Sequence, residues 1–151
     1  MSSNATEILP GLWIGNIKSS MDVAFLKDKQ IQCIINCTDQ HPFVDDPIVK
    51  VKYRLPIKDN LDINEIAKLY QSLDEFCEQI KINISMYNML IHCYAGKQRS
   101  PSLIIAYLMK YANMDLQSAK TALKSKKSDI FEPQFNFEPA LQLYWQKLNS
   151  S

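Results

Sequence analysis

The chain has 151 residues, 46% of them hydrophobic, and a formal net charge of +1. This length suffices for one domain with a hydrophobic core, and so small a net charge argues against general nucleic-acid binding. The sequence has no apolar run of about 18 residues and no secretory signal at its start, so we expect neither a membrane span nor secretion. Its four cysteines lack the spacing of metal ligands. We therefore expect a reduced protein that is cytoplasmic, or also nuclear, and that uses no metal or other cofactor.

The first half of the chain predicts strands that alternate with helices. Residues 1–7 are expected to be a short flexible leader, and residues 12–14, which follow a Pro-Gly turn, a short strand. A helix is expected over 20–29 and a further strand over 49–55. Between them, the nearly continuous apolar run at 31–37 predicts a central strand, and such runs are typical of parallel sheets that are covered on both faces.

An exposed loop is predicted at 56–62, and it contains Asp59 and Asp62. If a phosphate ester is the substrate, an aspartate on such a loop can protonate the leaving oxygen. Spacing alone favours a solvated carboxylate, or an N-cap for the amphipathic helix that the apolar periodicity predicts over 63–80. Asp62 is the better placed of the two for capping.

The strongest motif lies between an apolar run at 89–91, which predicts a buried strand, and another at 103–108, which predicts a buried helix. Ser100 is suited to the N-cap of that helix and Pro101 to its first position. The backbone N–H groups of a strand, loop and helix N-terminus favour the binding of a phosphate. Gly96 would let the backbone turn tightly and approach a ligand.

Cys93 begins this loop and Arg99 ends it. A lone buried cysteine is usually a small core residue. A thiol near an arginine and a helix N-terminus, however, is expected to ionise near neutral pH and to act as a nucleophile. The planar Arg99 guanidinium can bind two phosphate oxygens, and Ser100 can donate a hydrogen bond to the sulfur. Together these residues predict covalent phosphoryl transfer through a cysteinyl-phosphate.

Two more helices are predicted after this motif. The first begins after Asp115, a suitable cap, and ends in the basic run 124–127. That run is either a solvated helix C-terminus, favoured by the helix dipole, or a basic rim that steers phosphorylated substrates. The second helix is expected over 137–148.

The string His-Cys-x-x-Gly-x-x-Arg-Ser at 92–100 resembles the signature loop of the cysteine-dependent protein tyrosine phosphatases, most closely in the dual-specificity branch. Pro-Ile-Lys-Asp at 56–59 is similar to the general-acid loop of that family, and 133–137 to its Pro-Asn-x-x-Phe segment, with Gln134 in place of Asn. The resemblance implies a single catalytic domain over 8–148, followed by a tail at 149–151. It also implies a three-layer α/β fold, in which a twisted, mostly parallel sheet of four or five strands has helices on both faces.

The resemblance further implies roles for single residues. Cys93 would be the nucleophile, and Asp59 the general acid that later acts as a base. Ser100 would ease departure of the thiolate, and His92 would orient the loop through hydrogen bonds. The phosphate would be held by the loop residues Tyr94, Ala95, Gly96, Lys97, Gln98 and Arg99.

The implied substrates are proteins that carry phosphotyrosine, phosphoserine or phosphothreonine, with no nucleic-acid or membrane partner; the oligomeric state is not indicated. Lys97 follows Ala-Gly as in the phosphoinositide phosphatases, so a phosphoinositide is an alternative substrate, and an RNA 5′-phosphate is another. A phosphate-binding module without turnover is the alternative of a different class. A cysteine near the position of Cys37 forms a reversible disulfide with the nucleophile in the phosphoinositide branch, so Cys37 is either such a redox partner or an inert buried thiol.

Overall fold

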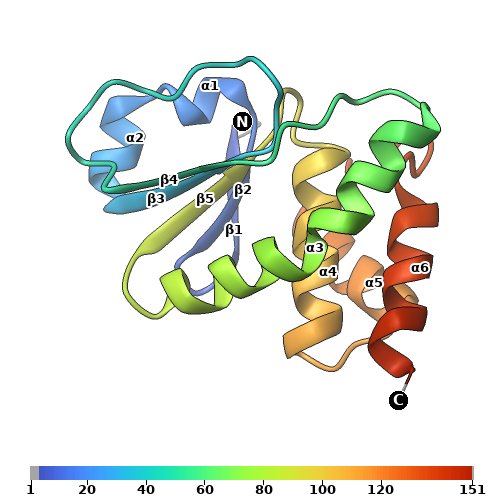
Figure 1. The fold of residues 1–151 in the computed structure, drawn as a ribbon. Coiled ribbons are helices and arrows are strands. Elements are labelled where there is room, and N and C mark those ends of the chain that lie inside the picture. The colour runs from blue at the N-terminus through green and yellow to red at the C-terminus, as the bar shows by residue number, and fades with distance from the viewer. Residues whose placement is uncertain (1–3, 151) are drawn as a thin grey trace.

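A five-stranded sheet separates two layers of helices in the computed structural model, which describes residues 4–150 (Figure 1). The strand order is β1-β2-β5-β3-β4; β1 is antiparallel to β2, and every other neighbouring pair is parallel. The expected α/β fold with a mostly parallel sheet is thus confirmed. The strands are β1 (Ala5–Leu9), β2 (Leu12–Gly15), β3 (Ile31–Asn36), β4 (Val51–Arg54) and β5 (Asn88–His92).

Two short helices cover one face of the sheet and four longer helices cover the other (Figure 1). None of the helices between residues 4 and 150 is both long and apolar enough to cross a membrane. The short helices are α1 (Ile17–Ser20) and α2 (Val23–Asp28). The longer helices are α3 (Ile63–Ile84), α4 (Arg99–Tyr111), α5 (Leu116–Lys126) and α6 (Glu138–Asn149).

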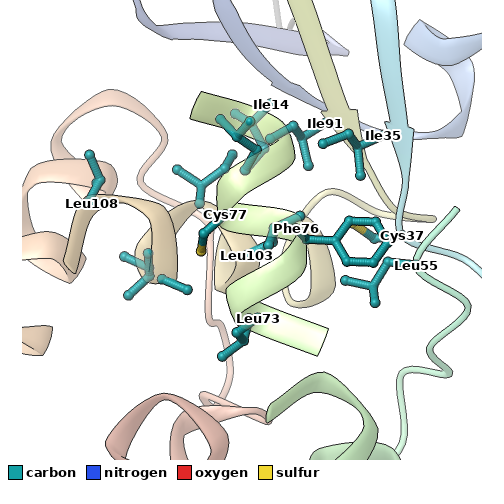
Figure 2. Packing of buried hydrophobic residues seen from close by; sticks show 14 of the residues in the cluster. Ile14, Ile35, Cys37, Leu55, Leu73, Phe76, Cys77, Ile91, Leu103 and Leu108 are labelled. Carbon is teal, nitrogen blue, oxygen red and sulfur yellow. The ribbon is translucent and has the colours of Figure 1, made fainter. Parts of the chain in front are cut away.

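Alternate residues of the central strands enter two separate cores, because successive side chains of a strand point to opposite faces. Ile34 and Leu90 pack with Leu26 of α2. Ile35 and Ile91 belong to the larger core beneath α3 and α4, where Figure 2 shows their side chains near Phe76. Burial on both faces explains why β3 and β5 are apolar along nearly their whole length.

The expected leader at 1–7 is wrong from residue 5 onward. Residues 5–7 belong to β1, in which Ala5 pairs with Gly15 and Glu7 with Trp13. Ala5 and Ile8 are buried, so apolar burial favours the strand. The expected helix at 20–29 is two helices, because the side chain of Asp22 accepts a hydrogen bond from the Phe25 N–H and starts α2 anew.

Three helix ends also differ from expectation. Ser100 does not cap α4: the helix begins at Arg99, Gln98 occupies the N-cap position without a side-chain cap bond, and Ser100 lies inside the first turn. Helix α3 continues to Ile84, four residues beyond the expected end at residue 80, because buried Ile80 and Asn83 extend its inner face. Helix α6 reaches Asn149, the first residue of the expected tail.

Asp74 joins three helices of the larger layer. Its carboxylate accepts hydrogen bonds from the Tyr144 hydroxyl at 2.6 Å and from Lys147 at 2.6 Å, both on α6. Lys110 of α4 lies 3.4 Å away. The hydrogen bonds from Lys147 and Tyr144 lower the pKa of Asp74 from 3.8 to about 2. A carboxyl whose pKa is lower in the folded state stabilises that state while it is ionised.

We expect Asp74→Asn to lower the free energy of unfolding by about 1 kcal/mol near pH 6, a figure discounted because the Asp74 side chain is 44% exposed. The stabilisation is present above pH 3.8 and is lost as the pH falls through about 2, so the difference from wild type should shrink over that interval. Urea unfolding between pH 2 and 6 measures it, with Glu75→Gln on the exposed side of α3 as the control. A difference that does not change with pH would contradict a role for the charge.

Candidate active site

The candidate site lies where the carboxyl ends of three parallel strands meet. Gly15 at the end of β2 and Asn36 at the end of β3 both pair with His92, the last residue of β5. Residues 93–98 follow as a loop, and α4 begins directly after them. The first N–H groups of α4 have no partner within the helix, so this edge of the sheet carries partial positive charge.

The loop is held at both of its ends by backbone hydrogen bonds. The carbonyl of Tyr94 accepts from the Ile17 N–H at 3.1 Å, and the carbonyl of Lys97 accepts from the Phe131 N–H at 2.8 Å. Between them, Gly96 has a φ of +75°, and a Cβ there would lie 2.9 Å from the Gly15 carbonyl oxygen. Residue 96 must therefore be glycine for both conformational and steric reasons.

Cys93 and Ser100 are in direct contact. Their Sγ and Oγ atoms are 3.2 Å apart, Cys93 is 2% exposed, and Ser100 is fully buried. Because the Ser100 hydroxyl is engaged with the sulfur, it is not available as a helix cap. This contact explains why the cap expected from the sequence is not formed.

Arg99 is buried with only part of its guanidinium satisfied. It is 8% exposed, and its Nη1 donates to the carbonyl of Ile57 at 2.8 Å. Its Nε atom has no hydrogen-bond partner among residues 4–150. A buried donor of this kind favours an anionic acceptor, because a charged acceptor recovers more of the lost solvation.

His92 is fully buried beneath the loop, and its Nδ1 lies 3.3 Å from the Cys93 carbonyl oxygen. Burial lowers the pKa of His92 to about 4, and the charges of His41, Arg54 and Arg99 act in the same direction. The imidazole is therefore neutral at pH 7. This state suits a residue that supports the loop and does not transfer protons.

Asp59 is exposed, and a segment distant in the sequence fixes its position. The Asn136 side-chain amide donates to Asp59 Oδ1 at 2.9 Å. The backbone N–H of Asn136 donates to Gln98 Oε1 at 3.0 Å, and Gln98 Nε2 donates to the Gln134 carbonyl at 2.6 Å. Gln98 thus links the signature loop to the residue that binds Asp59. Sequence reasoning missed the role of Asn136, because nothing local relates residues 77 positions apart.

Asp62, the other aspartate of the acid loop, is the N-cap of α3. Its carboxylate accepts from the Asn64 N–H at 2.7 Å. Glu65 supports the same loop, because its carboxylate accepts from the Lys58 N–H at 2.8 Å and pairs with Lys68 at 3.3 Å. The structure thus gives the two aspartates different surroundings, and only Asp59 is tied to the signature loop.

A second wall of the site is formed by the loop after β3, and two side chains beneath hold this loop. Asn36 donates to the His41 carbonyl at 2.8 Å and accepts from the Thr38 N–H and hydroxyl at 3.0 and 2.6 Å. Arg54 on β4 donates to the carbonyls of Thr38 and His41 at 3.0 and 2.8 Å. A cleft of about 330 Å³ is lined by Thr38, Asp39, Gln40, His41, Tyr94 and Arg99.

Cys37 lies between this wall and the signature strand. Its backbone N–H donates to the His92 carbonyl at 2.8 Å, and the residue is fully buried. Burial raises the pKa of the Cys37 thiol, nearby Cys93 adds to the rise, and Arg99 opposes it. All four cysteines are free thiols.

The basic side chains near the loop are partly neutralised. Lys127 pairs with Asp129 at 2.5 Å. Burial raises the pKa of Asp129, but Lys127 and the nearby charge of Lys97 together lower this pKa by more than burial raises it. The net shift of the Asp129 pKa is therefore downward. Among residues 4–150, no three histidine, cysteine or acidic side chains are grouped so that they could bind a metal ion.

Comparisons with known proteins agree on one family. The family described as "Dual specificity phosphatase, catalytic domain" matches residues 12–147. Human dual specificity protein phosphatase 6 is 33% identical over 132 residues, which cover 87% of this chain and 34% of the relative. Mouse dual specificity protein phosphatase 8 is 32% identical over 148 residues, which cover 97% of this chain and 22% of the relative. The chain thus spans about a third or less of the length of these relatives.

Two solved structures share the fold. The crystal structure of human DUSP28 has a TM-score of 0.86 at 22% identity, with 99% of this chain and 98% of that chain covered, and so bears on the fold alone. The crystal structure of DUSP15 has a TM-score of 0.79 at 25% identity and covers 97% of this chain and 92% of that one.

Proposed function

We propose that this chain, which belongs to the dual specificity phosphatase family, hydrolyses phosphate esters of tyrosine, serine and threonine in proteins through a cysteinyl-phosphate intermediate. The observation that carries the proposal is the 3.2 Å contact between Cys93 Sγ and the hydroxyl of Ser100, which lies in the first turn of a helix whose first residue is the buried Arg99. A nucleophile, an anion-binding cation and a helix N-terminus converge on one point there.

In the first step, the Cys93 thiolate attacks the phosphorus atom in line with the leaving oxygen. The loop N–H groups of residues 94–99 and the Arg99 guanidinium hold the other phosphoryl oxygens, and they stabilise the charge of the transition state. Asp59 protonates the leaving oxygen, which matters most for serine and threonine because their alkoxides are poor leaving groups. The hydrogen bond from Arg99 Nη1 to the Ile57 carbonyl supports a position of the acid loop beside the bound phosphate.

In the second step, water attacks the cysteinyl-phosphate, and Asp59 accepts a proton from that water. The sulfur leaves as a thiolate, which the Ser100 hydroxyl stabilises by donating a hydrogen bond over the 3.2 Å contact. His92, neutral and buried, supports the loop from below and takes no proton.

No observation favours the phosphoinositide or RNA alternatives. Lys97, on which the phosphoinositide alternative rests, lies near the Asp129 carboxylate.

We expect Cys93→Ser to lower kcat/KM for p-nitrophenyl phosphate by more than about 10³-fold, because the nucleophile is removed. Asp59→Ala should lower the rate on a phosphothreonine peptide by about 10²-fold and on the aryl ester by less.

The matched control is Asp62→Asn, which changes the helix cap of the same loop and should leave the rate within about twofold. Wild type that binds inorganic phosphate but hydrolyses neither substrate would overturn the catalytic proposal in favour of a binding module. Loss of activity in Asp62→Asn with Asp59→Ala unaffected would reassign the general acid.

We also expect Asn136→Ala to reduce the phosphothreonine rate about tenfold while the aryl ester rate changes little. The hydrogen bond from Asn136 to Asp59 is lost in this variant, and only the poorer leaving group depends strongly on a correctly placed acid. Steady-state rates on both substrates measure the ratio, with Asn64→Ala on the exposed start of α3 as the control. Equal losses on the two substrates would indicate a purely structural role.

The Cys37 disulfide stays a prediction, and the position of Cys37 beside the end of β5 supports it. Peroxide would convert the Cys93 thiolate to a sulfenic acid, and the Cys37 thiol would displace water from it to form the disulfide. Peptide mapping without reductant should then find the Cys37–Cys93 link, and Cys37→Ala should recover less activity on reduction than Cys33→Ala. Absence of the link would leave Cys37 an inert buried thiol.

The free thiols also support placing the protein in the cytoplasm or nucleus.

A further inference from the structure

We call the loop residues 94–99, which are proposed to hold the phosphate, the phosphate cradle. It borders the cleft of about 330 Å³ that lies between the loop after β3 and Tyr94. Arg99 is common to the cradle and the cleft. A group that enters the cleft therefore lies close to the phosphate that Arg99 binds, so one substrate molecule can carry both. Because the two are joined in one substrate, even a weak contact in the cleft acts at a high effective concentration.

The charges of the cleft favour a cation once a phosphate is bound. The phosphate occupies Arg99, and Asp39 is then the one charged side chain among the residues that line the cleft. Tyr94 is 64% exposed and presents an aromatic ring there. Burial and the charge of Arg54 lower the pKa of His41, so its ring adds no positive charge at pH 7. A carboxylate beside an aromatic ring is a good site for a guanidinium or ammonium group.

The wall that carries Asp39 is held in place before any substrate binds. Asn36 and Arg54 satisfy the carbonyls on both sides of Asp39, at Thr38 and His41. The His41 ring packs edge-on against the His92 ring, with centroids 6.0 Å apart, so the wall also rests on the base of the signature loop. A rigid wall loses little conformational entropy on binding and can therefore discriminate between substrates.

The Lys97 end of the phosphate-binding loop differs in charge from the Tyr94 end. The Lys97 carbonyl accepts from Phe131, and the Lys97 side chain lies near Asp129, which Lys127 also pairs. The cradle is thus flanked by lysines at its Lys97 end and by Asp39 at its Tyr94 end. This asymmetry gives a bound phosphopeptide a preferred side for a basic residue.

We propose that the cleft between Asp39 and Tyr94 is a specificity subsite that binds an arginine or lysine adjacent to the phosphorylated residue of a protein substrate. The proposal rests on the phosphatase activity proposed above and names the class of substrate that the same site prefers. Asp39 supplies the charge and Tyr94 the stacking surface, while Arg54 and Asn36 position the wall.

The test uses two sets of phosphotyrosine peptides. In the first set the residue directly after the phosphotyrosine is Arg, Ala or Glu, and in the second set the residue directly before it is varied in the same way. In one of the two sets we expect wild type to prefer Arg over Ala by about fivefold in kcat/KM, equivalent to about 1 kcal/mol. The preference should fall as salt is raised from 0.1 to 0.5 M. Asp39→Asn should reduce it to less than twofold, and Asp39→Lys should favour the Glu peptide.

The control variant is Asp45→Asn, which removes an exposed carboxylate of the same connection outside the cleft and should keep the wild-type preference. Hydrolysis of p-nitrophenyl phosphate, which lacks a neighbouring residue, should stay within about twofold in every Asp39 variant. Equal rates on the Arg, Ala and Glu peptides in both sets, or an Asp39→Asn variant that slows all substrates alike, would overturn the subsite and leave the phosphatase standing. No hydrolysis of any substrate by wild type would instead overturn the proposed function.

Discussion

The buried guanidinium of Arg99 is the group on which the rest of the candidate site depends. A buried cation is costly unless its donors are satisfied, and here one nitrogen donates to the Ile57 carbonyl while Nε has no partner among the described residues. The surrounding fold holds Arg99 in place, because it is the first residue of α4 and the following turn is buried against the sheet. The unpartnered Nε can donate to an anion, and this supports the phosphate site proposed here.

The two loops that flank Arg99 are held to the same frame by different means. The acid loop is tied to Arg99 through Ile57 and to α3 through Glu65, and Asn136 then fixes the exposed Asp59. The loop after β3 is held from below by Arg54. Each flank thus combines a rigid base with an acidic side chain, which is exposed at Asp59 and half-buried at Asp39. This division separates the acid catalysis proposed for Asp59 from the recognition proposed for Asp39.

Two of the predictions from sequence were wrong because a tertiary contact had replaced a local one. Ser100 has the residue type of a helix cap, but its hydroxyl contacts the Cys93 sulfur, and α4 starts two residues earlier than expected. Residues 5–7 look like a polar leader, yet they gain strand pairing and burial beside β2. In both cases a side chain or backbone group had two possible partners, and local propensity considers only the nearer one.

The sequence by itself determined the mostly parallel sheet, four of its five strands and the loop from Cys93 to Ser100, because apolar periodicity and a contiguous nine-residue string are local signals. The tertiary structure alone decided which distant residues complete the site. Gln98, Asn136 and Asp59 form one chain of hydrogen bonds across 77 positions, and Arg54 reaches back to the loop that carries Asp39. Such pairings depend on how the strands and helices are arranged in space. A side chain in a sequence does not specify its partner until the fold brings the two within hydrogen-bond distance.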